Sequence, residues 1–223
     1  MSVEPRMAFL GAQMLGAEGS VEGTLQHIRA QGFGLGSFTT GGLRNLRSSW
    51  ETYPDIKHSG FGTVYANQQL SFRIQHTQTP LCATVSLYWD TYQYAQAVSY
   101  QTRLFRTDQE DAVKYSRVFL GLGKCLFDTL APDFGWCDFS EPSGSTWFDD
   151  VDSLEFPYVY WANFLGARYV EKYGRKYLTD CPGTETQDLR HNGVLLVLAE
   201  SMSYGYHTTR DAVVAYLGEF EQP

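Results

Sequence analysis

The chain has 223 residues, of which 43% are hydrophobic, 15% are aromatic and only 19% are charged. This composition predicts a compact protein that buries a core without disulfides or metals, and it excludes a disordered chain. The net charge of −8 disfavours binding to nucleic acid or to anionic membranes. No apolar run approaches the roughly 20 residues of a membrane span, and no signal-peptide pattern opens the chain, so we expect a cytoplasmic protein.

The first 60 residues are the least patterned part of the chain. A short helix is expected over 21–30 after the capping Ser20, and the Gly-rich segment 32–42 predicts a loop. We therefore treat 1–60 as an N-terminal Gly-rich extension or subdomain of uncertain structure. It precedes an α+β domain over 61–223, and the two parts are expected to form one compact unit.

Strands are expected through the middle of the chain. Apolar and polar residues alternate over 70–76, which is the pattern of a half-buried strand. Further strands are expected over 61–66 and 83–90, whereas 93–105 has the composition of either a strand or a helix.

The clearest helix is expected over 108–130. Asp108 can cap its first turn, and apolar side chains recur at helical spacing as far as Leu130. Pro132 then ends the helix.

The remaining third alternates between short strands and short helices. Strands are expected over 134–139 and 156–161, and one helix or two short helices over 163–179. An Asn-Gly pair at 192–193 predicts a hairpin, and a closing helix is expected over 208–219. Strands grouped in runs, with helices between the runs, predict an α+β fold with a largely antiparallel sheet and helices packed on one face.

No cofactor or metal motif is present in the sequence. The four cysteines contain no CxxC pair, and no two of the five histidines lie within four residues of each other. We expect the cysteines to be reduced core residues and the protein to need no cofactor.

The stretch 125–167 contains eight acidic residues and no Lys, Arg or His, and it is rich in aromatic residues. Aromatic residues beside acids suit an interface with a basic protein, because the aromatics supply buried area and the acids steer the partner. The candidate contact residues are Glu141, Trp147, Phe148, Asp149, Asp150, Asp152 and Glu155.

Other interpretations of this stretch stay open. The acids could form an ordinary solvated loop beside an aromatic core. The acids of 149–155 could instead hold Mg²⁺ or Ca²⁺, or an acid pair from 128–155 could act as general acid and base, which would make the protein a carboxylate- or metal-dependent hydrolase. A third possibility is a sheet that holds a small molecule among its aromatic side chains.

The second half of the chain carries a pattern of aromatics and glycines that is similar to a known family. The run Pro-Asp-Phe-Gly-Trp-Cys-Asp at 132–138 is followed by an aromatic and Gly-containing run over 158–174, the Asn-Gly hairpin and the closing helix. This pattern, over about 105–220, resembles immunity proteins of bacterial polymorphic toxin and type VI secretion systems, in particular the immunity protein 52 family.

The resemblance implies a function through binding. Such a protein binds one cognate toxin, for example a nuclease effector with a basic surface, and blocks it by stoichiometric occlusion. It implies no catalytic activity of the protein itself. The acidic net charge, independently, leads us to expect no direct contact with nucleic acid and no association with a membrane.

Overall fold

The computed structural model describes residues 4–11, 26–35, 69–89, 93–99, 101–106, 108–139, 147–156 and 158–218. The expected strand over 61–66 and the contact candidate Glu141 lie outside the described residues. Residues 26–30 are helical, within the helix that was expected over 21–30.

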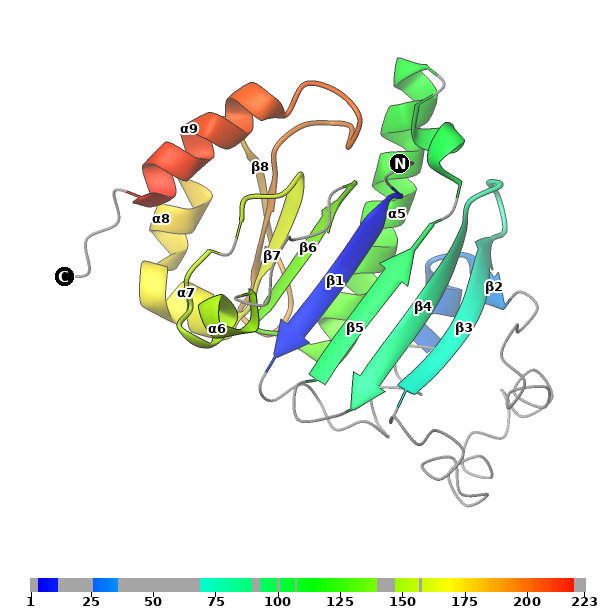
Figure 1. Cartoon of the computed structure of the whole chain (residues 1–223), viewed down its shortest axis with the longest axis horizontal. Helices are drawn as coiled ribbons and strands as arrows, with labels where there is room; N and C mark the ends of the chain where they lie inside the picture. Colours follow the sequence, from blue (N-terminus) through cyan, green and yellow to red (C-terminus); the bar gives the residue numbers. More distant parts are fainter. Residues whose placement is uncertain are drawn as a thin grey trace.

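One sheet of nine strands forms the centre of the described structure, and all of its neighbouring strands are antiparallel (Figure 1). The strands are β1 Arg6–Gly11, β2 Phe33–Leu35, β3 Gln69–His76, β4 Cys82–Trp89, β5 Gln93–Val98, β6 Phe134–Asp138, β7 Ala162–Leu165, β8 Glu185–Asp188 and β9 Val194–Val197. Their order across the sheet is β2-β3-β4-β5-β1-β6-β7-β9-β8. The expected α+β class with an antiparallel sheet is confirmed.

The helices are the 3₁₀ helix η2 Thr102–Phe105, α5 Gln109–Leu130, α6 Trp147–Asp152, α7 Ala167–Tyr173, α8 Arg175–Thr179 and α9 His207–Gly218. Helix α5 confirms the expected helix over 108–130. The Asp108 side chain accepts a hydrogen bond from the backbone N–H of Asp111 at 2.8 Å, and Ala131 ends the helix in the left-handed conformation. The ambiguous segment 93–105 divides into β5 and η2.

Helices cover both faces of the sheet rather than the one face that was expected. Helix α5 crosses behind β1 and β5 in Figure 1, and a Cβ atom added at Gly123 of α5 would lie 2.7 Å from the Phe164 ring of β7. Only glycine permits this close approach between helix and sheet. On the opposite face, the Tyr169 ring of α7 lies 5.5 Å from the Phe134 ring of β6.

Strand β1 lies in the middle of the sheet, between β5 and β6, although the sequence did not predict a strand there. Residues 7–10 are all buried, because both faces of this strand are covered. A strand covered on both faces shows a continuous apolar run instead of alternation, which explains why a period-two pattern did not reveal it. Residues 33–35, expected as part of a loop, form strand β2.

The strand expected over 156–161 and the helix expected from residue 163 are wrong in position. Strand β7 begins at Ala162 and the helix begins at Ala167. Asn163 accepts a hydrogen bond from the backbone N–H of Tyr160 at 2.9 Å and donates one to the Tyr160 carbonyl, also at 2.9 Å, so the chain turns before the strand. A Cβ atom at Gly166 would lie 2.1 Å from the Pro132 carbonyl oxygen, and this contact separates strand from helix.

The predicted hairpin is confirmed as β8 and β9. His191 and Asn192 have φ angles of 53° and 60°, the left-handed conformation that a two-residue hairpin turn requires. The closing helix is confirmed as α9, which buries Val213 and Leu217.

Candidate partner-binding site

The acidic stretch divides into structural acids and a surface group. Asp133 forms an ion pair with Arg168 at 3.1 Å, and Asp128 lies 3.6 Å from Arg190. Both arginines lie outside the stretch 125–167, which contains no basic residue. The fold therefore brings basic side chains to these two acids from other parts of the chain. Asp128 and Asp133 are therefore paired within the chain.

Asp138 is a fully buried acid that joins three segments of the fold. Its carboxylate accepts hydrogen bonds from the backbone N–H of Phe139 at 2.6 Å, from the backbone N–H of Trp161 at 3.1 Å and from the Tyr206 hydroxyl at 2.8 Å. Burial, followed by the charge of Asp138, raises the pKa of Tyr206, which therefore stays a donor. Three donors satisfy a buried carboxylate, so the role of Asp138 is structural.

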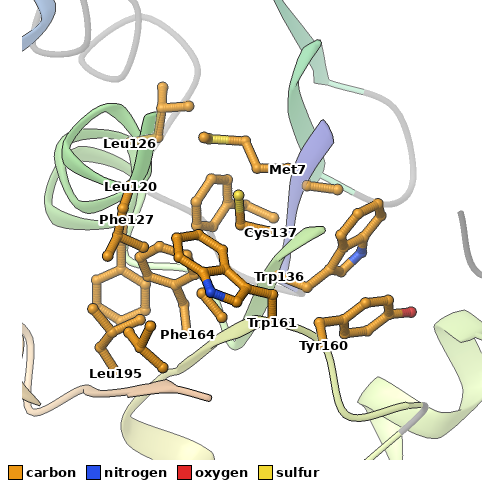
Figure 2. Close-up of a cluster of buried hydrophobic side chains, with 14 of the residues drawn as sticks. Met7, Leu120, Leu126, Phe127, Trp136, Cys137, Tyr160, Trp161, Phe164 and Leu195 are labelled. Atoms are coloured by element: carbon orange, nitrogen blue, oxygen red, sulfur yellow. The ribbon is translucent and has the colours of Figure 1, made fainter. Parts of the chain in front are cut away.

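Most aromatic residues of the stretch belong to the core instead of an outer surface (Figure 2). Phe134, Trp136, Tyr160 and Trp161 each expose 1% or less of their surface. Among the aromatic side chains of the stretch whose burial is described, Tyr158 is the exposed one, with 41% of its surface accessible. The four buried side chains pack the sheet, as the interpretation of an aromatic core beside acids expects, and they are not available to a partner.

The remaining acids of the stretch that the structure describes lie in α6 and the turn that follows it, and we call residues 147–156 the α6 corner. Asp152 and Glu155 are exposed, and Asp150 is half-buried. The turn is closed by a hydrogen bond of 2.8 Å from the backbone N–H of Glu155 to the Asp150 carbonyl. Leu154 adopts a left-handed conformation there, with φ of 56°.

Helix α7 holds the backbone of the α6 corner in place. The Tyr169 hydroxyl donates to the Glu155 carbonyl at 2.7 Å, and the Tyr173 hydroxyl donates to the Leu154 carbonyl at 2.9 Å. The Lys172 ammonium donates to the carbonyls of Ser153 and Leu154 at 3.1 and 3.0 Å. These contacts use main-chain acceptors only, so they fix the turn and leave its carboxylates unpaired among the described residues.

The structure brings together three of the predicted contact residues, Asp150, Asp152 and Glu155. Trp147, Phe148 and Asp149 belong to α6 by their backbone, and Glu141 lies outside the described residues. Within the described part of the chain, no three His, Cys, Asp or Glu side chains are grouped as metal ligands would be. The contact role of all seven residues stays a prediction.

Beside the α6 corner lies a group that sequence reasoning missed. The Tyr160 ring stacks on Trp136 at 4.7 Å and contacts the Tyr158 ring edge-on at 5.0 Å. The Arg210 guanidinium of α9 lies 5.4 Å from the centre of the Tyr158 ring and donates to the Tyr158 hydroxyl. Nothing in the sequence places Arg210 near residues 158–160, because the fold alone joins them.

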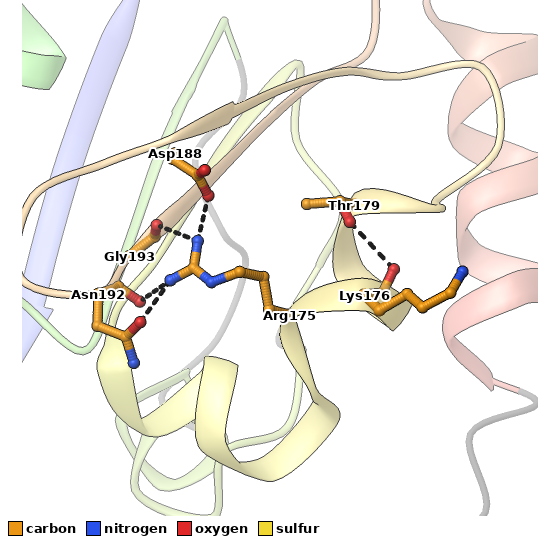
Figure 3. A network of polar contacts seen from close by, with 6 residues as sticks. All are labelled: Arg175, Lys176, Thr179, Asp188, Asn192 and Gly193. Atoms are coloured by element: carbon orange, nitrogen blue, oxygen red, sulfur yellow. Dashed lines mark hydrogen bonds and ion pairs between the residues drawn. The ribbon is translucent and has the colours of Figure 1, made fainter.

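A second turn with an acid is the β8–β9 turn, which carries Asp188, and we call residues 188–193 with Arg175 the hairpin corner (Figure 3). Arg175 forms an ion pair with Asp188 and donates to the side chain and the carbonyl of Asn192, the latter at 3.0 Å. Lys176, the next residue of α8, pairs with Asp180. Arg175 therefore joins α8 to the β8–β9 turn, whereas the exposed Lys176–Asp180 pair is local to one helical turn.

No protein-family model and no curated protein matches this chain. Among solved structures, the chain is similar to the Pseudomonas aeruginosa T6SS protein PA0821, with a TM-score of 0.53 and 10% sequence identity. The match covers 96% of this chain and 72% of that chain. The chain therefore shares its fold with a type VI secretion system protein. None of the described helices is long and apolar enough to cross a membrane.

Proposed function

We propose that the protein is an immunity protein that binds one cognate bacterial toxin in the cytoplasm and neutralises it by stoichiometric occlusion. The observation that carries this proposal is the α6 corner. Its backbone is fixed by Tyr169, Lys172 and Tyr173, while the carboxylates of Asp152 and Glu155 are exposed. The chain shares its fold with a type VI secretion system protein, and this likeness also supports the proposal.

A rigid turn with free carboxylates is suited to recognition. The turn is already ordered by contacts to α7, so docking costs little conformational entropy. Exposed carboxylates attract a basic partner and can accelerate association by roughly 10- to 1,000-fold at low ionic strength. A nuclease effector fits this description, because its substrate-binding surface is basic.

Occlusion requires no chemistry from this chain. Coverage of the toxin's substrate-binding surface is sufficient, and it calls for tight binding with a slow dissociation rate. The alternative of a carboxylate- or metal-dependent hydrolase has no observation in its favour among the described residues.

The test is co-expression of the full chain with the product of the adjacent gene, followed by affinity capture and size-exclusion chromatography. The proposal predicts a stable complex of equal stoichiometry and growth of cells that the neighbouring protein otherwise kills. A harmless neighbour that does not co-elute would contradict it.

A further inference from the structure

A series of three aromatic rings in contact leads from the core to the surface next to the α6 corner. Trp136 and Tyr160 each expose 1% of their surface, whereas Tyr158 exposes 41%. The ring centroids of Trp136 and Tyr160 are 4.7 Å apart, and those of Tyr160 and Tyr158 are 5.0 Å apart. In Figure 2 the Tyr160 hydroxyl points away from the buried cluster around Trp161. Tyr158 is thus an outer layer over the ring of Tyr160.

The Tyr160 hydroxyl is buried and has no hydrogen-bond partner among the described residues. Buried polar groups are almost always partnered, and leaving one unpartnered costs stability. Burial is the main cause that raises the pKa of Tyr160, and the charges of Asp138 and Asp150 add to it. The hydroxyl therefore stays protonated and lies within the field of Asp150 of α6.

Tyr158, the outermost of the three rings, already contacts a guanidinium. Arg210 lies 5.4 Å from the centre of the Tyr158 ring and donates to its hydroxyl. This is the geometry of a cation–π contact. The surface of Tyr158 therefore has the chemistry to hold an arginine side chain, with the carboxylates of Asp150 and Asp152 belonging to the adjacent helix α6.

We propose that Tyr158, Tyr160 and Asp150 form a subsite that receives one arginine side chain of the partner protein. The guanidinium stacks on the Tyr158 ring, donates one N–H to the Tyr160 hydroxyl oxygen and pairs with the Asp150 carboxylate. Arginine fits better than lysine because its planar group can stack and donate in several directions at once. Entry requires a rotamer change of the exposed Tyr158, which is a fast motion. The proposal rests on the proposed function for the source of the arginine.

The first test needs no toxin. The full chain, with ¹³C-labelled tyrosine, is titrated with L-arginine amide and with the neutral isostere L-citrulline amide, and the ring signals of Tyr158 and Tyr160 are followed by NMR. The proposal predicts saturable shifts with arginine amide only. Tyr160→Phe or Asp150→Asn should each weaken this binding by about fivefold, the value of one ordinary hydrogen bond.

Matched controls are Tyr204→Phe, at a tyrosine that is 43% exposed, and Glu171→Gln, at an exposed acid of α7. Both should bind arginine amide as the unaltered protein does. Tyr160→Phe should also melt at the same or a higher temperature, because it removes an unpartnered buried hydroxyl. A lower melting temperature would indicate a structural role for the hydroxyl, and either this result or the absence of shifts at Tyr158 and Tyr160 would overturn the proposal.

A second test uses the toxin captured by co-expression. If the toxin binds and Tyr160→Phe leaves its affinity unchanged, the subsite is wrong and the proposed function stands. If no toxin binds but arginine amide binds in a Tyr160-dependent way, the proposed function is wrong and the subsite stands. The two proposals can therefore fail separately.

Discussion

The α6 corner and the hairpin corner are two turns beside which the fold places a basic side chain, and it uses that side chain in different ways. At the hairpin corner, the carboxylate of Asp188 is paired with Arg175 inside the chain. At the α6 corner, Lys172 is bound to main-chain carbonyls, and the carboxylates of Asp152 and Glu155 face solvent. The contrast shows that a basic side chain near a turn can either pair with a carboxylate of the turn or bind only its backbone. We interpret the second arrangement as a surface prepared for a partner.

The largest effect is expected from reversing the charges of the α6 corner. Asp152→Lys combined with Glu155→Lys should weaken toxin binding by about 100-fold at low salt, or about 2.7 kcal/mol, because attraction becomes repulsion. The free energy of unfolding should change by less than about 0.5 kcal/mol, since both side chains are exposed. Calorimetric titration and urea unfolding measure the two quantities.

The matched control is Glu110→Lys combined with Glu200→Lys. Both glutamates are exposed and lie outside the α6 corner, so the net charge changes by the same amount. If the control weakens binding as strongly as the α6 variant, the toxin responds only to net charge and the location of the site is wrong.

A smaller effect is expected from loosening the backbone of the α6 corner. Lys172→Met keeps the aliphatic stem and removes the donors to Ser153 and Leu154. We expect toxin binding to weaken by about tenfold, because the turn must then be ordered on docking. The loss of a positive charge would by itself favour a basic toxin, so weaker binding would identify a positioning role. Lys114→Met, at an exposed lysine of α5, is the control and should bind normally.

At the hairpin corner the prediction is reversed, with an effect on stability and none on binding. Arg175→Ala removes the contacts to Asp188 and Asn192, and it should lower the free energy of unfolding by about 1 kcal/mol, since the pair is partly exposed. Toxin affinity should stay the same. An Arg175→Ala variant with native stability and weak binding would reverse the roles of the two corners.

The smallest expected effect is a pH dependence of stability at β8. A hydrogen bond from Arg117, at 2.7 Å, lowers the pKa of Glu185 below its ordinary value of 4.5. The pair therefore contributes stability above pH 4.5, and this contribution is lost as the pH falls through the lowered value. Because Glu185 is largely exposed, the contribution is a few tenths of a kcal/mol. As the pH is lowered, the Glu185→Gln variant should lose less unfolding free energy than the unaltered protein, and the difference should equal this amount.

Local patterns in the sequence predicted the elements whose residues carry their own signal. Helix α5 was predicted because its cap, apolar period and terminal proline agree, and the hairpin was predicted from its Asn-Gly turn. Strand β1 was missed because burial on both faces removes alternation. The starts of β7 and α7 were misplaced because Asn163 and Gly166 act through contacts with Tyr160 and Pro132 that the sequence does not show.

The candidate site was predicted only in part, for the same reason. The acidic bias of 128–155 was visible in the sequence. Which of its acids are paired, which are buried and which are exposed was not visible. Arg168 and Arg190 neutralise two of them from positions beyond the stretch, and Asp138 is buried. The proximity of Arg210 to Tyr158 depends on the packing of α9, which no local pattern encodes.

The most direct test of the central claim is amide hydrogen exchange on the full chain with and without the captured toxin. The account predicts slower exchange over 150–156 in the complex and unchanged exchange over 188–193. Protection of the hairpin corner without protection of the α6 corner would contradict it.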